Sequence, residues 1–488
     1  MNKTSIASAL YLVSVVALAL VIGCGSVSDP APLPPPLSAG NVNLIFVVSE
    51  DLAYSAPGDM NTSTANLSNQ GLQRSLQMGS FLKQKVLGGS NVTSIYALEP
   101  MTHLQTANNY PDMVALETIQ QFAMLNPISL SYEGTEPVTA DGYPILASYA
   151  AESLPPNVAT PALPCAACQG IDFTDQNGDN EALVSSILDA SLPGYYVFSA
   201  PWETVSSMMQ NISRSQGYNL TIPSSYAGPN AVYAISIPSS GSARLVTYDS
   251  NSDPASTYPQ LSLPAGAAGN TCSAQAPFHI QLAAGTAPAG VNTNETVYFI
   301  RHAEAHPTST WEDGNYIGAG QWRALALPAA LQGALQGKTQ PTQVISIDPS
   351  VAFPAPVASD VNASYVRPAL TVEPYAIANN LPYNLAANVA VFSQLPPTLS
   401  TFASNYFFTG GQFSNRTILV AWEHNELGTL MGALLASYQS SQAGPIWPDA
   451  DYDTIWRVTL DAHGNLSVDN NLCEGINSAA LPATPPQF

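Results

Sequence analysis

Cations are the scarcest feature of this 488-residue sequence. It has 12 Lys and Arg against 34 Asp and Glu, for a net charge of −22. No basic face can be assembled to replace phosphate counterions, and this excludes nucleic acid as a partner. Charged residues make up only 9% of the chain, against roughly 25% in an average soluble domain. A surface whose polarity comes from Ser, Thr, Asn and Gln suits a setting outside the cytoplasm.

Cysteine is also scarce, with five residues in the whole chain. The first, Cys24, follows an apolar stretch of signal-peptide length that ends in Gly23. A lone transmembrane anchor is the alternative, but the apolar run is short for a span. The stretch resembles a bacterial lipoprotein signal, which implies lipidation of Cys24 and an extracytoplasmic place in the cell envelope. We expect a signal peptide over residues 1–23 and a Pro-rich tether over 24–40.

Four cysteines remain after Cys24, and export makes disulfides their expected state. Four cysteines allow three connectivities, among which a sequence cannot choose. We favour a local Cys165–Cys168 bridge and a long-range Cys272–Cys473 bridge. A redox-active or zinc-binding Cys-x-x-Cys is the alternative, but no neighbouring His or second Cys-x-x-Cys supports it.

The chain shows the same order of signals twice. The strand pattern "NLIFVV" precedes the helical "LSNQGLQRSLQMGSFLKQKV", and "TVYFIR" precedes "GAGQWRALALPAALQGAL". Both helices carry Gly-x-x-Arg, at Gly71–Arg74 and Gly320–Arg323. Strands that alternate with helices predict an α/β fold with a mostly parallel sheet. We expect a first domain over 41–250, a linker over 251–274, a second domain over 275–475 and a tail over 476–488. We refer to the two domains below as the first and second halves.

Chemically useful side chains follow two strands of the second half. Arg301 and His302 come directly after one strand, and Glu423 and His424 follow a later one. Ligands in open α/β sheets bind at the carboxyl ends of the strands, so we expect these residues to meet. A neutral imidazole can attack phosphorus while Arg and a second His hold the charged oxygens. The pattern therefore predicts phosphoryl chemistry.

Three features together resemble the histidine phosphatase superfamily, which has the phosphoglycerate mutase-like fold. They are the strand followed by Arg-His-Ala-Glu, the Gly-x-x-Arg helix, and the late strand with a His. The resemblance implies two three-layer α/β/α domains with mostly parallel central sheets. It implies that His302 is the phosphorylated nucleophile, that Arg301 and Arg367 bind phosphate, and that His424 is the second histidine. Ala303 stands where the family has Gly.

Arg367 is matched by the residues that follow it. The family's second Arg lies on a helix four residues before a Thr and shortly before a Pro, as Arg367 lies before Thr371 and Pro374. The family usually passes from Ser-Ser-Pro directly to that Arg. Here "SVAFPAPVASDVNA" intervenes, and we interpret it as an insertion.

A general acid is the least defined part of the predicted site. Protonation of the leaving oxygen calls for a carboxylic acid near the phosphorus. Some family members place Asp directly after the second His, where this chain has Asn425. Of the remaining Glu304, Glu423 and Glu426, we name Glu304 and Glu423 as candidates. Neighbours on a strand point to opposite faces, which would separate Glu423 from His424. No metal or cofactor is expected, because Arg and His stabilise the charge.

Other polar residues have ordinary interpretations. His306 is expected in a loop, and His103, His279 and His463 are expected to be structural or exposed. The segment "DFTDQNGDNEAL" resembles a calcium loop, but its Gly is misplaced for the EF-hand pattern. An acidic turn is therefore favoured.

The first half lacks the residues that define the predicted site. A carboxylate at the position of the nucleophile would repel phosphate, so we expect this half to be catalytically inactive. Aligning the two halves places Ser49 opposite Arg301, Glu50 opposite His302, Trp202 opposite His424, and Thr102 or His103 opposite the second Arg.

The sequence thus predicts an exported, lipid-anchored phosphatase that hydrolyses phosphate monoesters of small molecules through a phosphohistidine. A mutase is less favoured, because phosphorylated glycolytic acids are not expected outside the cytoplasm. The alternative from another class is a catalytically inactive, ligand-binding lipoprotein on the same fold.

Overall fold

The computed structural model describes residues 32–126, 128–130, 138–160, 169–269, 275–305, 313–351, 363–389 and 397–488. Residues 34–488 form one compact unit, and residues 32 and 33 belong to a second unit, Met1–Leu33. The signal peptide, His306 and four of the five cysteines lie outside the described residues. Cys473 is disulfide-bonded. Its pairing with Cys272, like the Cys165–Cys168 bridge, stays a prediction.

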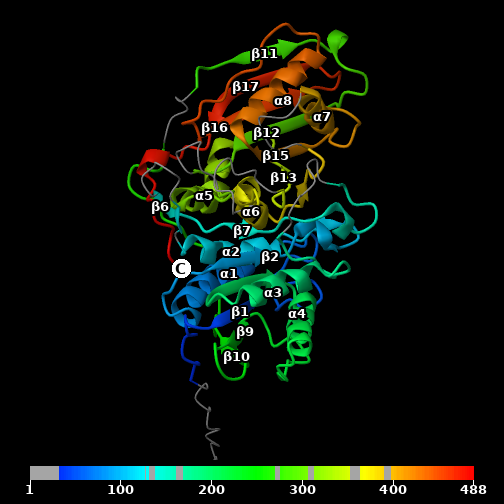
Figure 1. Ribbon diagram of the computed structural model, residues 1–488. Coiled ribbons are helices and arrows are strands. Elements are labelled where there is room, and N and C mark those ends of the chain that lie inside the picture. The colour runs from blue at the N-terminus through cyan, green and yellow to red at the C-terminus, as the bar shows by residue number, and fades with distance from the viewer. Residues whose placement is uncertain are drawn as a thin grey trace, which may run out of the picture. The chain divides into compact units, whose positions relative to one another are not determined.

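The first sheet has six strands among the described residues, all from the first half of the chain (Figure 1). The strands β1, β8, β2 and β7 run parallel, and β9 and β10 complete the sheet as an antiparallel hairpin. Every residue of β1 and β8 is buried, as expected for parallel strands covered on both faces. In spatial order the strands are β10 (Arg244–Asp249), β9 (Ala231–Ile237), β1 (Val42–Val48), β8 (Gly194–Ala200), β2 (Ser94–Ala97) and β7 (Ile145–Leu146).

The second sheet repeats this order and these directions, with β11 added at the antiparallel edge. The α/β class and the repeated order of strands and hairpins predicted from the sequence are confirmed. In spatial order the strands are β11 (His279–Leu282), β17 (Leu466–Cys473), β16 (Thr454–Leu460), β12 (Glu295–Arg301), β15 (Thr417–Trp422), β13 (Gln343–Ser346) and β14 (Tyr383–Leu385).

Helices cover both faces of each sheet because alternate strand residues carry apolar side chains to opposite sides. On the first sheet, Leu44 and Phe46 pack with α4, whereas Ile45 and Val47 pack with α2. The first-half helices are α1 (Asn69–Phe81), α2 (Val114–Met124), α3 (Asp179–Ala190) and α4 (Trp202–Ser215). The second-half helices are α5 (Gly318–Ala334), α6 (Arg367–Asn379), α7 (Pro397–Phe408) and α8 (His424–Ser437).

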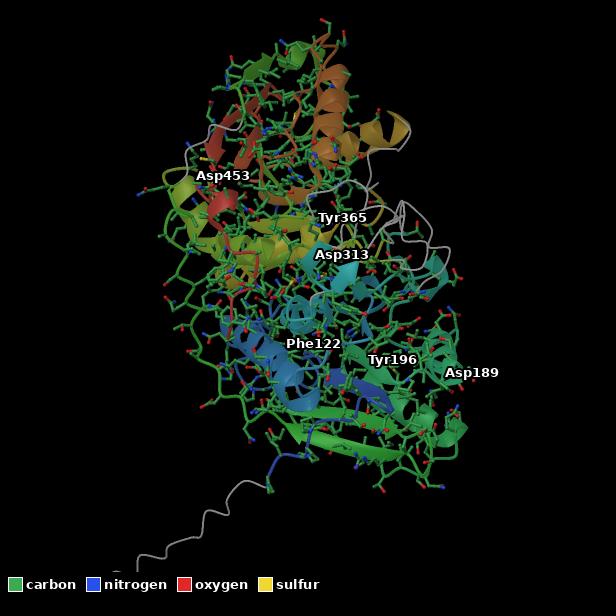
Figure 2. All side chains as sticks on the ribbon, turned by 60° about the vertical axis from the view of Figure 1, so that its left-hand side comes forward. Phe122, Asp189, Tyr196, Asp313, Tyr365 and Asp453 are labelled. Carbon is green, nitrogen blue, oxygen red and sulfur yellow. The ribbon has the colours of Figure 1, made fainter. Side chains whose placement is uncertain are left out.

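The helix pairs α1/α2 and α5/α6 pack together in one apolar cluster that reaches from β1 to β12. Side chains of the two halves also bond directly, as in the 2.6 Å bond that the Tyr149 hydroxyl donates to Asp348. Figure 2 shows Phe122 of α2 within this packed region. The layers therefore run from α3/α4 through the first sheet, the four inner helices and the second sheet to α7/α8.

Short elements complete the described chain. They are the π-helix η1 (Leu82–Val86), the 3-10 helices η2 (Pro100–Thr102), η3 (Ala151–Ser153), η4 (Ala284–Thr286) and η5 (Ser478–Ala480), and the strands β3 (Leu104–Gln105), β4 (Tyr110–Pro111), β5 (Ile128–Leu130) and β6 (Val138–Asp141).

Candidate active site

The carboxyl ends of β12 and β15 lie side by side in the second sheet. Arg301 is the last residue of β12 and pairs in register with Trp422, the last residue of β15. The N–H of His302 then donates to the Trp422 carbonyl at 3.0 Å. The parallel pairing therefore brings the predicted Arg-His pair beside the start of α8, where His424 lies.

His302 is held as a neutral imidazole. Its side chain is buried, and Nδ1 lies 2.8 Å from the Ala303 carbonyl oxygen. Because a carbonyl only accepts hydrogen bonds, we assign the ring proton to Nδ1 and the lone pair to Nε2. Burial, and after it the positive charges of Arg367 and Arg301, hold the pKa of His302 well below its ordinary value. The ring therefore offers an uncharged nucleophilic nitrogen at neutral pH.

Arg301 is anchored by the segment that precedes β16. Its Nη1 donates to the backbone carbonyls of Asp449 and Asp451, and its Nη2 donates to the Tyr452 hydroxyl at 3.3 Å. The guanidinium carbon lies 3.9 Å from the centre of the Tyr452 ring. Nε is buried and has no hydrogen-bond partner among the described residues. The Nε donor of Arg301 is thus left to bind a ligand oxygen.

Arg367 begins α6 and reaches the same site. Its backbone N–H donates to the Gly314 carbonyl at 3.0 Å, and its Nε donates to the Asn315 carbonyl at 2.7 Å. Thr371, one turn along α6, accepts a 2.8 Å bond from the Ala303 N–H. This contact joins α6 to the loop that carries His302. The interpretation of an insertion before Arg367 concerns residues that lie largely outside the described chain.

Gly314 is required where it stands. Its φ of +74° is in the left-handed region, and a Cβ there would lie 2.0 Å from the Ser364 carbonyl oxygen. This close approach lets the Gly314–Asn315 backbone accept the two bonds from Arg367.

His424 lies between two carboxylates. Its Nδ1 is 2.5 Å from Glu423 Oε1, in an ion-pair contact, and its Nε2 is 3.0 Å from Asp449 Oδ1. The expectation that Glu423 and His424 point apart is wrong, because β15 ends at Trp422. Glu423 is the N-cap of α8 and accepts from the Glu426 N–H at 2.9 Å. The helical turn brings the two side chains together.

Glu423 is favoured in its ionised form. Burial raises its pKa, but the His424 contact, the Glu426 N–H and the Arg301 charge together lower it below the ordinary value. Glu426 behaves in the opposite way, since burial and the Glu423 charge raise its pKa to about 7.

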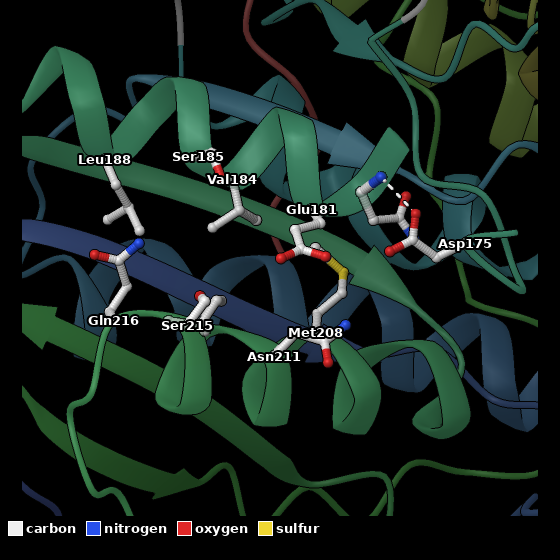
Figure 3. A pocket seen from close by; sticks show the side chains of 11 residues that line it. Asp175, Glu181, Val184, Ser185, Leu188, Met208, Asn211, Ser215 and Gln216 are labelled. Atoms are coloured by element: carbon white, nitrogen blue, oxygen red, sulfur yellow. Dashed lines mark hydrogen bonds between the residues drawn. The ribbon is translucent and has the colours of Figure 1, made fainter. Parts of the chain in front are cut away.

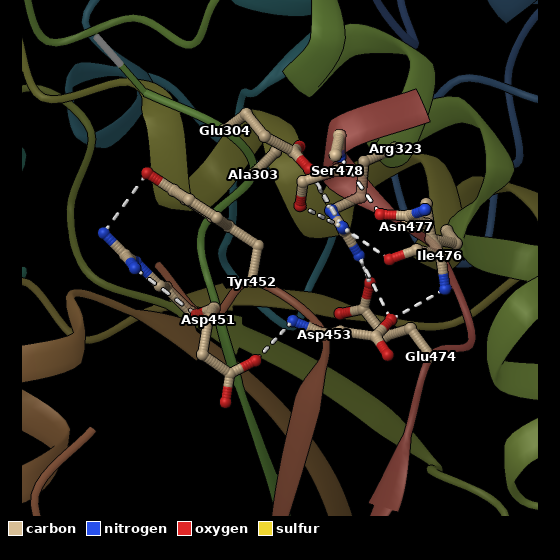
Figure 4. Close-up of polar contacts among 12 residues, drawn as sticks. Ala303, Glu304, Arg323, Asp451, Tyr452, Asp453, Glu474, Ile476, Asn477 and Ser478 are labelled. Carbon is tan, nitrogen blue, oxygen red and sulfur yellow. Dashed lines mark hydrogen bonds and ion pairs between the residues drawn. The ribbon is translucent and has the colours of Figure 1, made fainter. Parts of the chain in front are cut away.

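Glu304 bonds to Arg323, in an ion-pair cluster that Figure 4 shows. Arg323 is fully buried and donates to Glu304 at 2.9 Å and to Glu474 at 2.5 Å. The equivalent Arg74 of the first half pairs with Asp59 at 2.6 Å. The Gly-x-x-Arg repeat is therefore a structural clamp between a helix and the loop after a strand.

Three residues of the site escaped the sequence interpretation. Tyr365 and Tyr452 lie beside His302, with ring centroids 6.3 and 6.1 Å from the imidazole. Asp449 contacts both His424 and Arg301. Tyr365 stands two residues before Arg367, which was a usable signal, but nothing in the sequence links Asp449 or Tyr452 to the strand ends.

In the described residues of the first half, the positions equivalent to Arg301 and His302 carry other side chains. The pairing of Val48 with Ala200, the last residue of β8, makes Val48 equivalent to Arg301. The Ser49 N–H donates to the Ala200 carbonyl at 3.0 Å, as the His302 N–H donates to that of Trp422. Ser49, not Glu50, is therefore the equivalent of His302, and the sequence alignment was wrong by one residue.

The position equivalent to the second Arg was also misplaced. Arg367 is the first residue of α6, and the corresponding helix α2 begins at Val114. Thr102 and His103 lie before this helix, in and just after η2. Trp202 begins α4 as His424 begins α8, so this part of the alignment agrees with the structure.

The acidic segment before α3 is built as a turn (Figure 3). Asp175 Oδ1 accepts from the Asn180 N–H at 2.9 Å, and Asp172 Oδ1 accepts from the Thr174 N–H at 2.8 Å. Both carboxylates thus satisfy backbone donors around the helix start. Elsewhere, one group in the described chain has metal-ligand spacing, formed by Asp51, His103 and Asp112.

Comparisons with known proteins give no family assignment. No family model matches the chain, and no curated protein matches it. One solved structure that matches is that of a candidate phosphohistidine phosphatase, SixA, from Nakamurella multipartitia, at 14% identity over 41% of this chain and 96% of that one. The TM-score is 0.20, which is too low to carry an argument about fold or activity.

Proposed function

We propose that the second half hydrolyses phosphate monoesters through a phosphohistidine at His302. The observation that carries the proposal is the state of this ring. A buried, neutral imidazole with Nδ1 fixed on the Ala303 carbonyl presents Nε2 as a nucleophile between two arginines. The proposal includes the phosphoglycerate mutase-like architecture for both halves.

The proposed reaction has two steps. In the first, the Nε2 lone pair of His302 attacks phosphorus, an N–P bond forms, and the P–O bond to the alcohol breaks with transfer of a proton to the leaving oxygen. In the second, water attacks phosphorus, the N–P bond breaks, and the electron pair returns to Nε2. The water proton leaves to a base, and inorganic phosphate is released.

Charge on the transferred phosphoryl group would be held by the arginines and the second histidine. Arg301 offers its buried Nε, Arg367 lies one α6 turn from the Thr371–Ala303 bond, and His424 offers Nε2. Fixed donors in a buried site stabilise developing charge without reorganisation. These groups belong to the chain itself.

The proton donor is better assigned to His424 than to either predicted glutamate. Glu304 is bonded to the fully buried Arg323. Glu423 has a lowered pKa and therefore lacks a proton to give at neutral pH. In the proposed role Glu423 orients the ring, and an imidazolium at His424 donates to the leaving oxygen.

A non-catalytic binding protein is the second candidate. It is favoured by Arg301, whose two Nη groups already bond to the Asp449–Tyr452 segment. If that segment stays in place, these bonded N–H groups cannot bind a reacting phosphoryl group.

We also propose that the protein is exported and lipid-anchored through Cys24. No helix among the described residues is long and apolar enough to cross a membrane. Labelling of the full chain with a radioactive fatty acid in a bacterial host tests the proposal. Loss of label in Cys24→Ala is expected, and equal label in both would overturn it.

The activity is tested with the chain from residue 25 on a panel of phosphate monoesters between pH 3 and 8. Phosphate release is expected from the parent and from His463→Ala, a control that removes an exposed histidine. Release should vanish in His302→Ala. Mass spectrometry of acid-labile phosphate on a quenched sample should place the group on His302. No release and no phosphohistidine in the parent would leave the binding protein as the better account.

A further inference from the structure

Three potential metal ligands meet at the carboxyl end of the first sheet. Asp51 follows β1, His103 follows η2, and Asp112 precedes α2. The imidazole Nδ1 lies 2.8 Å from Asp112 Oδ2 and 3.5 Å from Asp51 Oδ2, and all three ligand atoms lie within 4.8 Å of one another. The cluster occupies the region of the first half that corresponds to the candidate active site of the second.

The carboxylate of Asp51 is buried without sufficient partners. Asp51 is 4% exposed, and its Oδ1 accepts from the Ala53 N–H at 2.7 Å. Its Oδ2 has no hydrogen-bond partner among the described residues. His103 Nδ1 carries at most one proton, which the 2.8 Å contact directs to Asp112. Asp51 Oδ2 therefore lies in the cluster with only the 3.5 Å contact to the imidazole beside it.

The charges also fail to balance. Two buried carboxylates face one imidazole, and Asp112 is fully buried. A buried charge without a partner is costly, and a bound cation removes that cost for both carboxylates.

The donor set favours a transition metal over calcium or magnesium. One imidazole nitrogen and two carboxylate oxygens are ligands of Zn²⁺ and Mn²⁺, whereas Ca²⁺ and Mg²⁺ prefer oxygen alone. Ligands about 2.1 Å from a tetrahedral ion stand about 3.4 Å apart, close to the His103–Asp51 separation. The shorter contact to Asp112 would open as the ion replaces the hydrogen bond.

The imidazole is oriented and accessible. Its ring stacks on Phe173, with centroids 3.7 Å apart and planes 8° apart. His103 and Phe173 also line a cavity of about 590 Å³, so the imidazole borders open space. We propose that Asp51, His103 and Asp112 bind a divalent transition-metal ion, with the remaining positions left to water. The first half would then be a metal-binding module, whether or not the second half is a phosphatase.

Zinc titration by calorimetry tests the proposal on the chain from residue 25 after removal of metals with a chelator. We expect one equivalent of Zn²⁺ to bind to the parent and to the controls His463→Ala and His302→Ala. Asp51→Asn and His103→Ala should each weaken zinc binding by about tenfold to 100-fold. X-ray absorption at the zinc edge should show nitrogen and oxygen ligands without sulfur.

Asp51→Asn keeps the test decisive should His103→Ala misfold. Its side-chain oxygen can still accept the Ala53 bond, so the chelated variant should melt no lower than the chelated parent. Zinc should raise the melting temperature of the parent but not that of Asp51→Asn. Absence of zinc binding by the parent, or equal binding by Asp51→Asn, would overturn the proposal.

Discussion

Ser49 occupies in the first sheet the position that His302 occupies in the second. Ser49 follows β1, which pairs with β8, and His302 follows β12, which pairs with β15. Each donates its N–H, at 3.0 Å, to the carbonyl of the last residue of the paired strand. The backbone pairing at the two positions is therefore equivalent, and the side chains differ. A hydroxyl without a neighbouring base is a weak nucleophile, so the first half retains the scaffold without the proposed chemistry.

Substitution of His302 should abolish phosphate release, whereas substitution of Ser49 should leave it nearly unchanged. We expect His302→Ala to lower phosphate release by about three orders of magnitude or more, since it removes the attacking atom. Ser49→Ala should keep release within about twofold. Ser49 Oγ is buried and has no hydrogen-bond partner in the part of the chain that the structure describes, so the variant should also unfold at an equal or higher urea concentration. A comparable loss of activity in both variants would contradict the assignment.

Arg323 should matter for stability and not for chemistry. Arg323→Met leaves Glu304 and Glu474 buried without their cation, so we expect a loss of about 3–5 kcal/mol in the free energy of unfolding. The matched Arg74→Met leaves one buried carboxylate, Asp59, without its cation instead of two, and should cost less. Urea titrations measure both. Below the unfolding transition, kcat of Arg323→Met should stay within about threefold of the parent value. A loss of kcat without a loss of stability would instead support Glu304 as a catalytic residue.

The elements that depend on local pattern were predictable. Continuous apolar runs predicted the strands β1 and β12, and the Gly-x-x-Arg segments lie in the helices predicted to follow them. The meeting of His302 with His424 followed from the rule that parallel strands bring their carboxyl ends together.

Features that depend on register or on distant loops were not predictable. A continuous apolar run such as "NLIFVVSE" does not show which residue pairs with which on the neighbouring strand. The sequence alignment of the first half with the second was therefore wrong by one residue. The end of β15 at Trp422 turned Glu423 into a helix cap, which a strand interpretation could not foresee. Asp449 reaches His424 from an irregular segment with no periodicity.

Two glutamates between the halves should make stability depend on pH. Glu117 of α2 and Glu373 of α6 are both buried and bond to each other. Burial raises the pKa of Glu117 to about 7 from 4.5, and burial with the Glu117 charge raises that of Glu373. Because both pKa values rise on folding, their stabilisation is complete below about pH 4.5 and is lost as the pH passes 7.

Glu373→Gln should remove part of this dependence. An amide at position 373 can donate to Glu117 at any pH, so we expect the variant to be more stable than the parent by about 1–3 kcal/mol at pH 8 and equal to it at pH 4. Urea unfolding at the two pH values measures the difference. Glu152→Gln, which changes an exposed glutamate, should match the parent at both. A gain of equal size at pH 4 would show that the effect is not the titration of the pair.

Asp449 should compete with phosphate for His424. Its carboxylate contacts Nε2 at 3.0 Å although the side chain is 95% exposed, so an anion entering the site must displace it. An exposed pair of this kind is worth about 0.2–1 kcal/mol. Asp449→Ala should therefore lower the inhibition constant of inorganic phosphate by about 1.4-fold to fivefold. The backbone carbonyl that receives Arg301 is unchanged by this substitution. Asp189→Ala removes an equal charge from the exposed end of α3 (Figure 2) and should leave the constant unchanged. If inhibition weakens in Asp449→Ala, the carboxylate orients His424 for phosphate instead of competing with it.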